Sequence, residues 1–479
     1  MSETEPFSPV FQTFRDPDGA VIMHDDRVLR LLGDNGRDSL SKLLENRTIN
    51  FAMSEGRLPK TRLLGDQESA PLIGEADGTW SAIAEHERLP FVSYPHEWPA
   101  EMLHAAAEAT LDLARQLHKE GLGLKDATPY NIVFRGTAPV FVDMLSIERR
   151  EPNNPIWLAE SQFQRAFLLP LLCWKLFGIP TTRAFMTSRD GMTPDEVHQL
   201  AHGLSRLSPS VLQLASLPVW LSGWAERSMG SGRPIGRQLR NPEMASYVLA
   251  RSNSRMYRHL KRLSPGSRVS HWRYYEESHS YGNEEVLAKD KFVKEVIDNL
   301  GKVSVLDIGC NTGRYSLAAA EAGNMVVAID SDPVTAGLAW RRARDAGADV
   351  SIITADLAAP TPSLGWTNRE WLALLPRLQG RFELTMALAV VHHLIVSGGI
   401  PLPSILKQFA KFTTRYLLVE YIDPTDDNFR RLSRGRDNLY SGLTLENFET
   451  EARSLFTIEK QMEVIPGKRT LYLLRNREV

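Results

Sequence analysis

The stretch that decides the fold is Val303-Ser304-Val305-Leu306-Asp307-Ile308-Gly309-Cys310-Asn311-Thr312-Gly313. A β-branched and aliphatic run ends in the acid Asp307 and passes into a turn with two glycines, and the alanine-rich residues 314–322 that follow predict a helix. A second strand is expected over residues 325–329, directly before Asp330. This strand, turn, helix and strand predict one βαβ unit of an α/β fold with a parallel sheet. We expect a ligand at the carboxyl ends of such strands.

The turn from Gly309 to Gly313 favours a cationic ligand that carries no phosphate there. Its glycines let the backbone turn tightly and approach a ligand closely. Phosphate-binding turns of this kind carry three glycines as G-x-G-x-x-G, whereas this one reads Gly-Cys-Asn-Thr-Gly. A carboxylate at Asp307 would repel a pyrophosphate. The acid after the second strand, Asp330, is placed to hold ribose hydroxyls.

The same residues resemble the motifs of class I S-adenosylmethionine-dependent methyltransferases. Asp330, in Ala-Ile-Asp-Ser-Asp, resembles the acid that binds the adenosyl ribose, and Asp356, in Thr-Ala-Asp-Leu, lies where that family holds the adenine amine. Residues 387–394 resemble the fourth strand with its turn, and residues 417–421 resemble the fifth. The resemblance implies a Rossmann-like seven-stranded sheet that ends in a hairpin. Another doubly wound domain, such as a dehydrogenase, is the alternative.

S-adenosyl-L-methionine is the cofactor that this resemblance implies. We expect it to contact Asp307, Gly309, Cys310, Asn311, Gly313, Asp330, Ser331, Asp356, Leu357 and Ala387. Three side chains are candidate bases for a hydroxyl acceptor, namely His392, His393 and Glu420. Since His-His-Leu recurs there in methyltransferases with different acceptors, a structural role for at least one ring is the alternative. Candidate acceptor residues are Tyr275, Tyr281, Trp366 and Tyr421, each of which could instead serve packing.

Residues 1–262 predict a separate α+β domain. A helix is expected over residues 100–119, and residues 50–52 are expected to be extended. Leu-Lys-Asp-Ala-Thr-Pro-Tyr-Asn, followed by Pro-Val-Phe-Val-Asp, resembles the catalytic segment of protein-kinase-like folds. The resemblance implies that Asp126 orients an acceptor hydroxyl, while Asn131 and Asp143 hold magnesium on ATP.

Several features of this part argue against kinase activity. Leu124 replaces the usual histidine, and residues 11–75 hold neither a glycine-rich loop nor a clear strand lysine. Asp126 and Asn131 could instead hydrogen-bond a surface turn, with Asp143 capping the next element. The segment together with the methyltransferase motifs also resembles the NoeA-like nodulation methyltransferase proteins over most of the chain. That resemblance implies methyl transfer but gives no acceptor.

The composition narrows the class of protein. A length of 479 residues suggests two or three domains, and a net charge of −2 gives no strong field to attract nucleic acid. No apolar run approaches the roughly 20 residues of a membrane helix, and the polar start is unlike a secretory signal. The two cysteines, Cys173 and Cys310, exclude a disulfide scaffold or a cysteine-built zinc site. We therefore expect a cytoplasmic protein without a metal.

We predict a class I methyltransferase domain over residues 263–479, after the α+β domain of residues 1–262. The acceptor is expected to be a small molecule or a glycan- or lipid-type molecule, with O-methylation favoured. One alternative is a bifunctional kinase and methyltransferase that binds ATP and magnesium. Another is a non-enzymatic interaction protein with an inert methyltransferase fold, against which the series Asp307, Asp330 and Asp356 argues.

Overall fold

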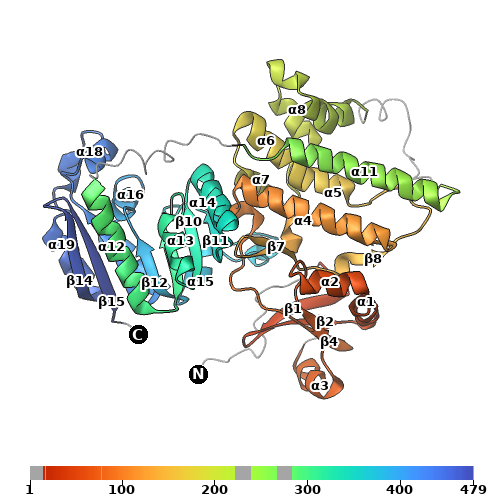
Figure 1. Ribbon diagram of the computed structural model, residues 1–479, viewed down its shortest axis with the longest axis horizontal. Helices are drawn as coiled ribbons and strands as arrows, with labels where there is room; N and C mark the ends of the chain where they lie inside the picture. The colour runs from red at the N-terminus through yellow and green to blue at the C-terminus, as the bar shows by residue number, and fades with distance from the viewer. Residues whose placement is uncertain (1–14, 17, 77, 222–238, 267–282, 478–479) are drawn as a thin grey trace. The chain divides into compact units, whose positions relative to one another are not determined.

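The computed structural model describes residues 15–16, 18–76, 78–221, 239–266 and 283–477 (Figure 1). The chain forms two compact units. The first contains Met1–Gly266 together with Ser363–Trp371, and the second contains Ser267–Pro362 with Leu372–Val479. The short segment 363–371 therefore belongs to the first unit although its neighbours in sequence belong to the second.

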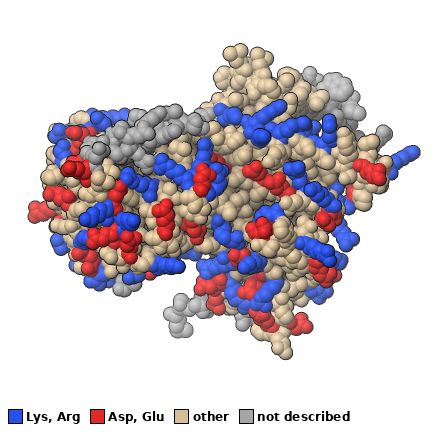
Figure 2. Space-filling model, in the orientation of Figure 1, with Lys and Arg blue, Asp and Glu red and all other residues tan. Residues whose placement is uncertain are grey.

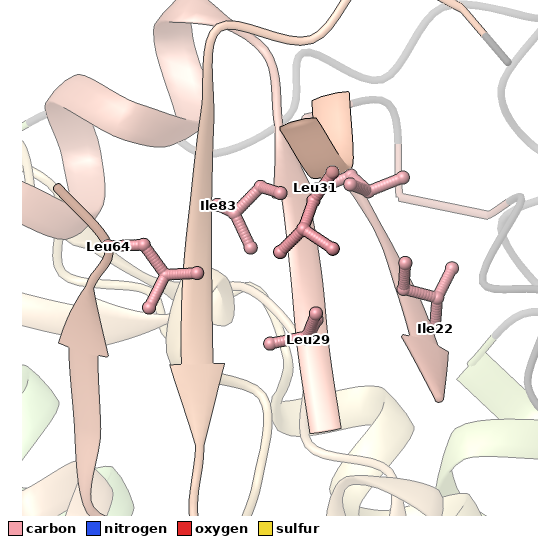
Figure 3. Close-up of a cluster of buried hydrophobic side chains, with 6 residues drawn as sticks. Ile22, Leu29, Leu31, Leu64 and Ile83 are labelled. Atoms are coloured by element: carbon pink, nitrogen blue, oxygen red, sulfur yellow. The ribbon is translucent and has the colours of Figure 1, made fainter. Parts of the chain in front are cut away.

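A four-stranded antiparallel sheet opens the first unit, in the order β1-β2-β4-β3. Its strands are β1 (Gly19–His24), β2 (Arg27–Leu32), β3 (Thr61–Leu63) and β4 (Ala82–His86). Leu29 and Leu31 of β2, Ile83 of β4, and Leu64 just after β3 meet in one buried cluster with Ile22 of β1 (Figure 3). The alternation of side chains along each strand places these apolar residues on one face of the sheet.

Residues 50–52 are helical, so the expectation of an extended segment there was wrong. They lie within α2 (Arg47–Ser54), which Asn46 caps with its side-chain oxygen on two backbone N–H groups, at 2.8 and 3.2 Å. Ile49 and Ala52 are both fully buried. Three residues apart, they share one helix face. The cap and this apolar face outweigh the strand-like composition.

Most of the remaining first unit is helical. The helix predicted over residues 100–119 is confirmed as α4 (Ala100–Lys119), which packs against β5 and α11. Two antiparallel ribbons, β5 with β8 and β6 with β7, flank the segment 125–131. Their bounds are β5 (Leu122–Leu124), β6 (Ile132–Arg135), β7 (Ala138–Phe141) and β8 (Ile147–Arg149). The other helices are α1 (Asp34–Leu44), α3 (Asp66–Glu75), α5 (Glu160–Phe163), α6 (Leu169–Phe177), α7 (Thr181–Thr187), α8 (Pro194–Leu200), α9 (Pro209–Val211) and α11 (Pro242–Arg262).

The predicted seven-stranded sheet of the second unit is confirmed, with the order β11-β10-β9-β12-β13-β15-β14. The strands are β9 (Ser304–Ile308), β10 (Met325–Asp330), β11 (Val350–Thr354), β12 (Phe382–Ala387), β13 (Thr413–Ile422), β14 (Phe456–Ile465) and β15 (Arg469–Asn476). The first five pair in parallel, and β15 lies antiparallel between β13 and β14. β10 and β11 are almost wholly buried, as expected of strands covered on both faces.

Helices join the parallel strands as crossovers. They are α13 (Arg314–Glu321), α14 (Pro333–Ala346), α15 (Leu374–Leu378), α16 (Val391–Val396) and α17 (Leu402–Phe412), with α12 (Asn283–Leu300) before β9 and α18 (Asp427–Ser433) and α19 (Leu445–Leu455) after β13. The chain runs from β9 outward to β10 and β11 and then returns to β12 on the other side of β9. This reversal opens a crevice at the carboxyl ends of β9 and β12.

The surface carries both signs of charge. On the face shown in Figure 2, acidic and basic side chains are interspersed over each unit. Among the residues that the structure describes, no helix combines the length and the apolar character that crossing a bilayer requires.

Candidate active site

A cavity of about 370 Å³ lies in the second unit, at the carboxyl ends of its parallel strands. This volume lies within the usual range for small-molecule and cofactor sites. Most of the residues predicted to contact the cofactor line it: Asp307, Gly309, Cys310, Asn311, Asp330, Ser331, Asp356 and Leu357. The other two, Gly313 and Ala387, are not among the lining residues; Gly313 is the N-cap residue directly before α13, and Ala387 ends β12.

The turn after β9 requires glycine at two positions. Gly309 and Gly313 have φ values of +71° and +84°, in the left-handed region that glycine tolerates best. A Cβ atom on Gly309 would come within 2.3 Å of the Cγ2 of Val390. A Cβ on Gly313 would lie 3.2 Å from the Cβ of Ala339. The backbone at Gly309 therefore fits closely between β9 and the turn after β12.

Asp330 ends β10 and organises the turn beside it. Its Oδ2 accepts a hydrogen bond from the backbone N–H of Asn311 at 2.8 Å. Its Oδ1 accepts bonds from the backbone N–H of Asp332 at 2.9 Å and from the hydroxyl of Thr335 at 3.0 Å. Burial raises the pKa of this carboxyl, and the three hydrogen bonds oppose that rise. The side chain is thus fixed where it faces the cavity.

Asp307 is the most deeply buried acid of the cavity wall. It is 3% exposed, and its Oδ2 accepts a bond from the hydroxyl of Ser316 at 2.5 Å. Burial raises its pKa to about 6, a rise that the Ser316 bond opposes and the Asp330 charge increases. The carboxylate is therefore ionised at neutral pH and would be stabilised by a positive ligand. Asp356 also lines the cavity but is exposed, and its Oδ1 accepts a bond from the backbone N–H of Ala358 at 2.8 Å.

The two candidate histidines have different surroundings. His393 lines the cavity, whereas His392 does not. Their rings are 4.2 Å apart, and His392 stacks at 6.3 Å on Phe429, away from the lining residues. Burial lowers the pKa of His393 to about 4 and that of His392 well below its ordinary value. Both rings are neutral at pH 7, and His393 is the one that faces the ligand space.

Glu420, the third candidate base, lies behind the cavity wall. Its side chain is fully buried and is not among the lining residues. The ammonium of Lys289, from α12, donates a hydrogen bond to its Oε2 at 2.6 Å, and Lys289 does line the cavity. The sequence analysis missed Lys289, as it missed Tyr315, another lining residue, whose hydroxyl donates to Asp290 at 3.1 Å. Of these two residues, only Tyr315 carried a signal in the sequence, because it lies two residues after Gly313 of the glycine turn.

The candidate acceptor residues are spread over the chain. Tyr275 and Tyr281 lie outside the described residues. Tyr421 is buried and is not among the lining residues of the cavity; its hydroxyl has two acceptors within hydrogen-bond distance, Asp423 at 3.0 Å and the backbone carbonyl of Leu443 at 2.9 Å. Trp366 is 67% exposed and belongs to segment 363–371 of the first unit.

Segment 363–371 is anchored inside the first unit. The indole of Trp371 stacks on the ring of Tyr130 with 4.2 Å between ring centroids. Arg15 donates to Glu370 through its Nε at 2.5 Å and through its Nη2 at 3.0 Å. Glu370 also accepts a bond from the backbone N–H of Trp366 at 2.6 Å. These contacts fix the segment beside Asn131, the neighbour of Tyr130.

The kinase-like candidates of the first unit lie on the loops between the two ribbons. The Oδ1 of Asp143 accepts bonds from both Nη atoms of Arg30, at 3.1 and 3.0 Å, and Arg30 also donates to Asp16 at 2.7 Å. Asp143 makes no side-chain cap on the following turn. The backbone N–H of Asp126 donates to Ser146 at 3.1 Å. The carbonyl of Asn131 accepts from Val142 at 2.8 Å, which brings the strand before Asp143 to this loop.

The strand order, the glycine turn, the acids at consecutive strand ends and the cavity above them define a class I S-adenosylmethionine-dependent methyltransferase domain. Residues 305–369 match the family described as "Methyltransferase domain". The chain is therefore an enzyme of this class, a methyltransferase that uses S-adenosylmethionine.

Over nearly its whole length the chain is similar to nodulation protein NoeA of Rhizobium meliloti (strain 1021). The two are 27% identical over 472 residues, which are 97% of this chain and 96% of NoeA.

Solved structures give shorter matches. The bifunctional kinase-methyltransferase WbdD is 18% identical, with a TM-score of 0.30 over 43% of this chain and 42% of WbdD, so the match spans about two fifths of that protein. The N-methyltransferase NodS from Bradyrhizobium japonicum WM9 is 17% identical, with a TM-score of 0.29 over 40% of this chain and 97% of NodS.

Proposed function

We propose that the second unit methylates an oxygen atom of a small-molecule or a glycan- or lipid-type acceptor, with His393 as the base. The observation that carries this proposal is the neutral imidazole of His393 on the cavity wall. A hydroxyl must lose its proton as its oxygen gains the methyl group, and a neutral imidazole can accept that proton. When bound, S-adenosylmethionine supplies an activated methyl group on a cationic sulfur.

The residues around the cavity support the cofactor assignment. In this proposal the carboxylate of Asp330 holds the ribose hydroxyls, and Asp356 holds the adenine amine at the end of β11. The ionised Asp307 lies toward the cationic part of the molecule. The glycine turn fits too, since a side chain at Gly309 would collide with Val390 and narrow the cavity. What this chain contributes is binding, orientation and a proton acceptor.

The test begins with the acceptor. Purified enzyme and isotopically labelled S-adenosylmethionine are incubated with small-molecule and glycolipid fractions, and mass spectrometry identifies molecules that gain one methyl group. With that acceptor, His393→Gln should lower kcat by about a hundredfold or more, as expected for loss of a general base, and leave the Kd for S-adenosylhomocysteine unchanged. Lys294→Met, an exposed change on α12, is the control. A product methylated on nitrogen or carbon, or unchanged turnover by His393→Gln, would contradict the proposal.

A second activity, magnesium-dependent phosphoryl transfer from ATP in the first unit, is favoured by Arg30. The sequence analysis found no strand lysine, but β2 carries this guanidinium at 3.0 Å from Asp143. Arginine binds phosphate groups well, so Arg30 and Asp143 would hold the phosphates and the metal. Titration calorimetry with ATP, with and without magnesium, tests this candidate. Magnesium-dependent binding that Asp143→Ala abolishes would support it, and the absence of any nucleotide binding would remove it.

A further inference from the structure

A buried ion pair lies at the wall of the methyltransferase cavity. The ammonium of Lys289, in α12, is 2.6 Å from the Oε2 of Glu420, in β13, and their side chains are 8% and 0% exposed. Lys289 contributes to the cavity wall, whereas Glu420 lies behind it. A cation thus faces the ligand space with its counter-ion on the protein side.

The strand order shows which part of a ligand this cation meets. Asp356 follows β11 and Asp330 ends β10, both on one side of β9, whereas β12 and β13 lie on the other side. If these two acids hold the nucleoside, the remainder of the ligand extends toward β12 and β13, where Glu420 anchors Lys289. The positive charge of Lys289 also lowers the pKa of Asp307, although burial raises that pKa by more.

Stability alone does not explain this pair. Transfer of an ammonium and a carboxylate from water into a protein interior costs several kcal/mol for each ion, and their attraction often only offsets that cost. The ammonium has three N–H donors, so it can hold Glu420 and a ligand oxygen together. The ring of Tyr315, 5.9 Å from the Nζ, further restricts where the ammonium can lie. The arrangement is that of a cation fixed in place for an anionic oxygen.

We propose that Lys289, fixed by Glu420, binds the carboxylate of the amino-acid part of the cofactor; this inference rests on the proposed function. That part carries an ammonium, a sulfur centre and a carboxylate, of which only the carboxylate is an anion. Asp307 and Asp330 make the nearby wall negative, which suits the ammonium and the sulfonium but repels a carboxylate. Two cations among the described residues line the cavity, Lys289 and Arg314. Arg314 is 44% exposed and pairs with Asp290, whereas Lys289 is buried, so Lys289 is the cation better placed to hold an anionic oxygen inside the cavity. Glu420 is then a positioning residue, which keeps the ammonium in place before the ligand arrives.

Two ligands separate this role from a general effect on the site. S-adenosylhomocysteine carries the amino-acid part, and 5′-methylthioadenosine is the thionucleoside without it. Calorimetry on the full chain should show that Lys289→Met weakens S-adenosylhomocysteine binding by about tenfold or more, the usual effect of losing a hydrogen bond between charged groups. Binding of 5′-methylthioadenosine should stay within about twofold. Lys289→Arg, which keeps the charge, should restore part of the lost affinity.

Further variants control for a general effect of charge on binding and for unfolding of the single variant. Lys294→Met removes the same charge from an exposed position of α12 and should leave both affinities unchanged. Lys289→Met with Glu420→Gln removes both charges, so that no buried carboxylate is left unpaired if the single variant unfolds; it should show the same selective loss. Equal weakening of both ligands, or no change for either, would overturn the inference. Failure of the wild-type chain to bind either ligand would instead show that the proposed function itself is wrong.

Discussion

Replacement of Asp330 by asparagine tests the cofactor assignment most directly. Three donors converge on its two carboxylate oxygens: the backbone N–H groups of Asn311 and Asp332 and the hydroxyl of Thr335. An asparagine side chain has a single oxygen, so its amide NH₂ must face one of these donors. A buried donor left without its acceptor costs about 1–3 kcal/mol, so Asp330→Asn should lower the free energy of unfolding by about that much. The free energy of ligand binding should change by more than the free energy of unfolding, because the proposed contact with the ribose uses the same carboxylate.

A hydrogen bond from a hydroxyl to a charged acceptor contributes about 1.5–3 kcal/mol, so loss of two ribose contacts corresponds to about 3 kcal/mol or more. The Kd for S-adenosylhomocysteine should therefore rise by about two orders of magnitude. Calorimetry measures this change, and urea denaturation monitored by circular dichroism measures the stability. Asp332→Asn is the matched control: it removes the same charge two residues away, and asparagine preserves the N-cap that Asp332 makes on α14. If Asp330→Asn were folded and bound with wild-type affinity, Asp330 would not contact the ligand.

Three further changes test the geometry. Gly309→Ala should lower both ligand affinity and stability, because the φ of residue 309 is +71° and the new Cβ would lie 2.3 Å from the Cγ2 of Val390. Adding Val390→Ala should recover part of both losses, as measured by calorimetry and thermal melts. Asp307→Asn should flatten the pH dependence of stability between about pH 4 and 6. Burial raises the pKa of Asp307 to about 6, so ionisation of this carboxyl lowers the free energy of unfolding as the pH rises from about 4 through 6, by about 3 kcal/mol in total. An unaltered pH profile would contradict this. Asp426→Ala should lower the free energy of unfolding in urea by about 3–5 kcal/mol, because it removes the carboxylate that accepts two hydrogen bonds, at 2.7 and 2.8 Å, from the buried guanidinium of Arg469. A loss below about 1 kcal/mol would refute the importance of this pair.

The sequence predicted those parts of the site that local pattern controls. Asp307, Asp330 and Asp356 each follow or end a short apolar run, and parallel strands bring their carboxyl ends to one edge of a sheet. The glycines between β9 and α13 were found in the same way, since their spacing is a local property of the turn. For these residues the period of the pattern and the turn chemistry were sufficient.

Pairings across long separations could not be predicted. Lys289 is one of several lysines on an amphipathic helix, and its counter-ion Glu420 is 131 residues away. Arg30 was overlooked for a related reason: the search was for a strand lysine, and only the folded chain shows which strand cation reaches Asp143. The two neighbouring histidines were indistinguishable by type and spacing. Packing against Phe429 separates His392 from His393, and packing is not a local property.

The membership of residues 363–371 in the first unit limits how the protein can be divided. A fragment that stops after residue 262 keeps Tyr130 and Arg15 but loses Trp371 and Glu370, which are their stacking and ion-pair partners. A fragment that starts at residue 263 contains Trp371 and Glu370, on the segment between β11 and β12, but lacks Tyr130 and Arg15. Each half therefore lacks contacts that the full chain makes, and binding and activity are best measured on the full chain.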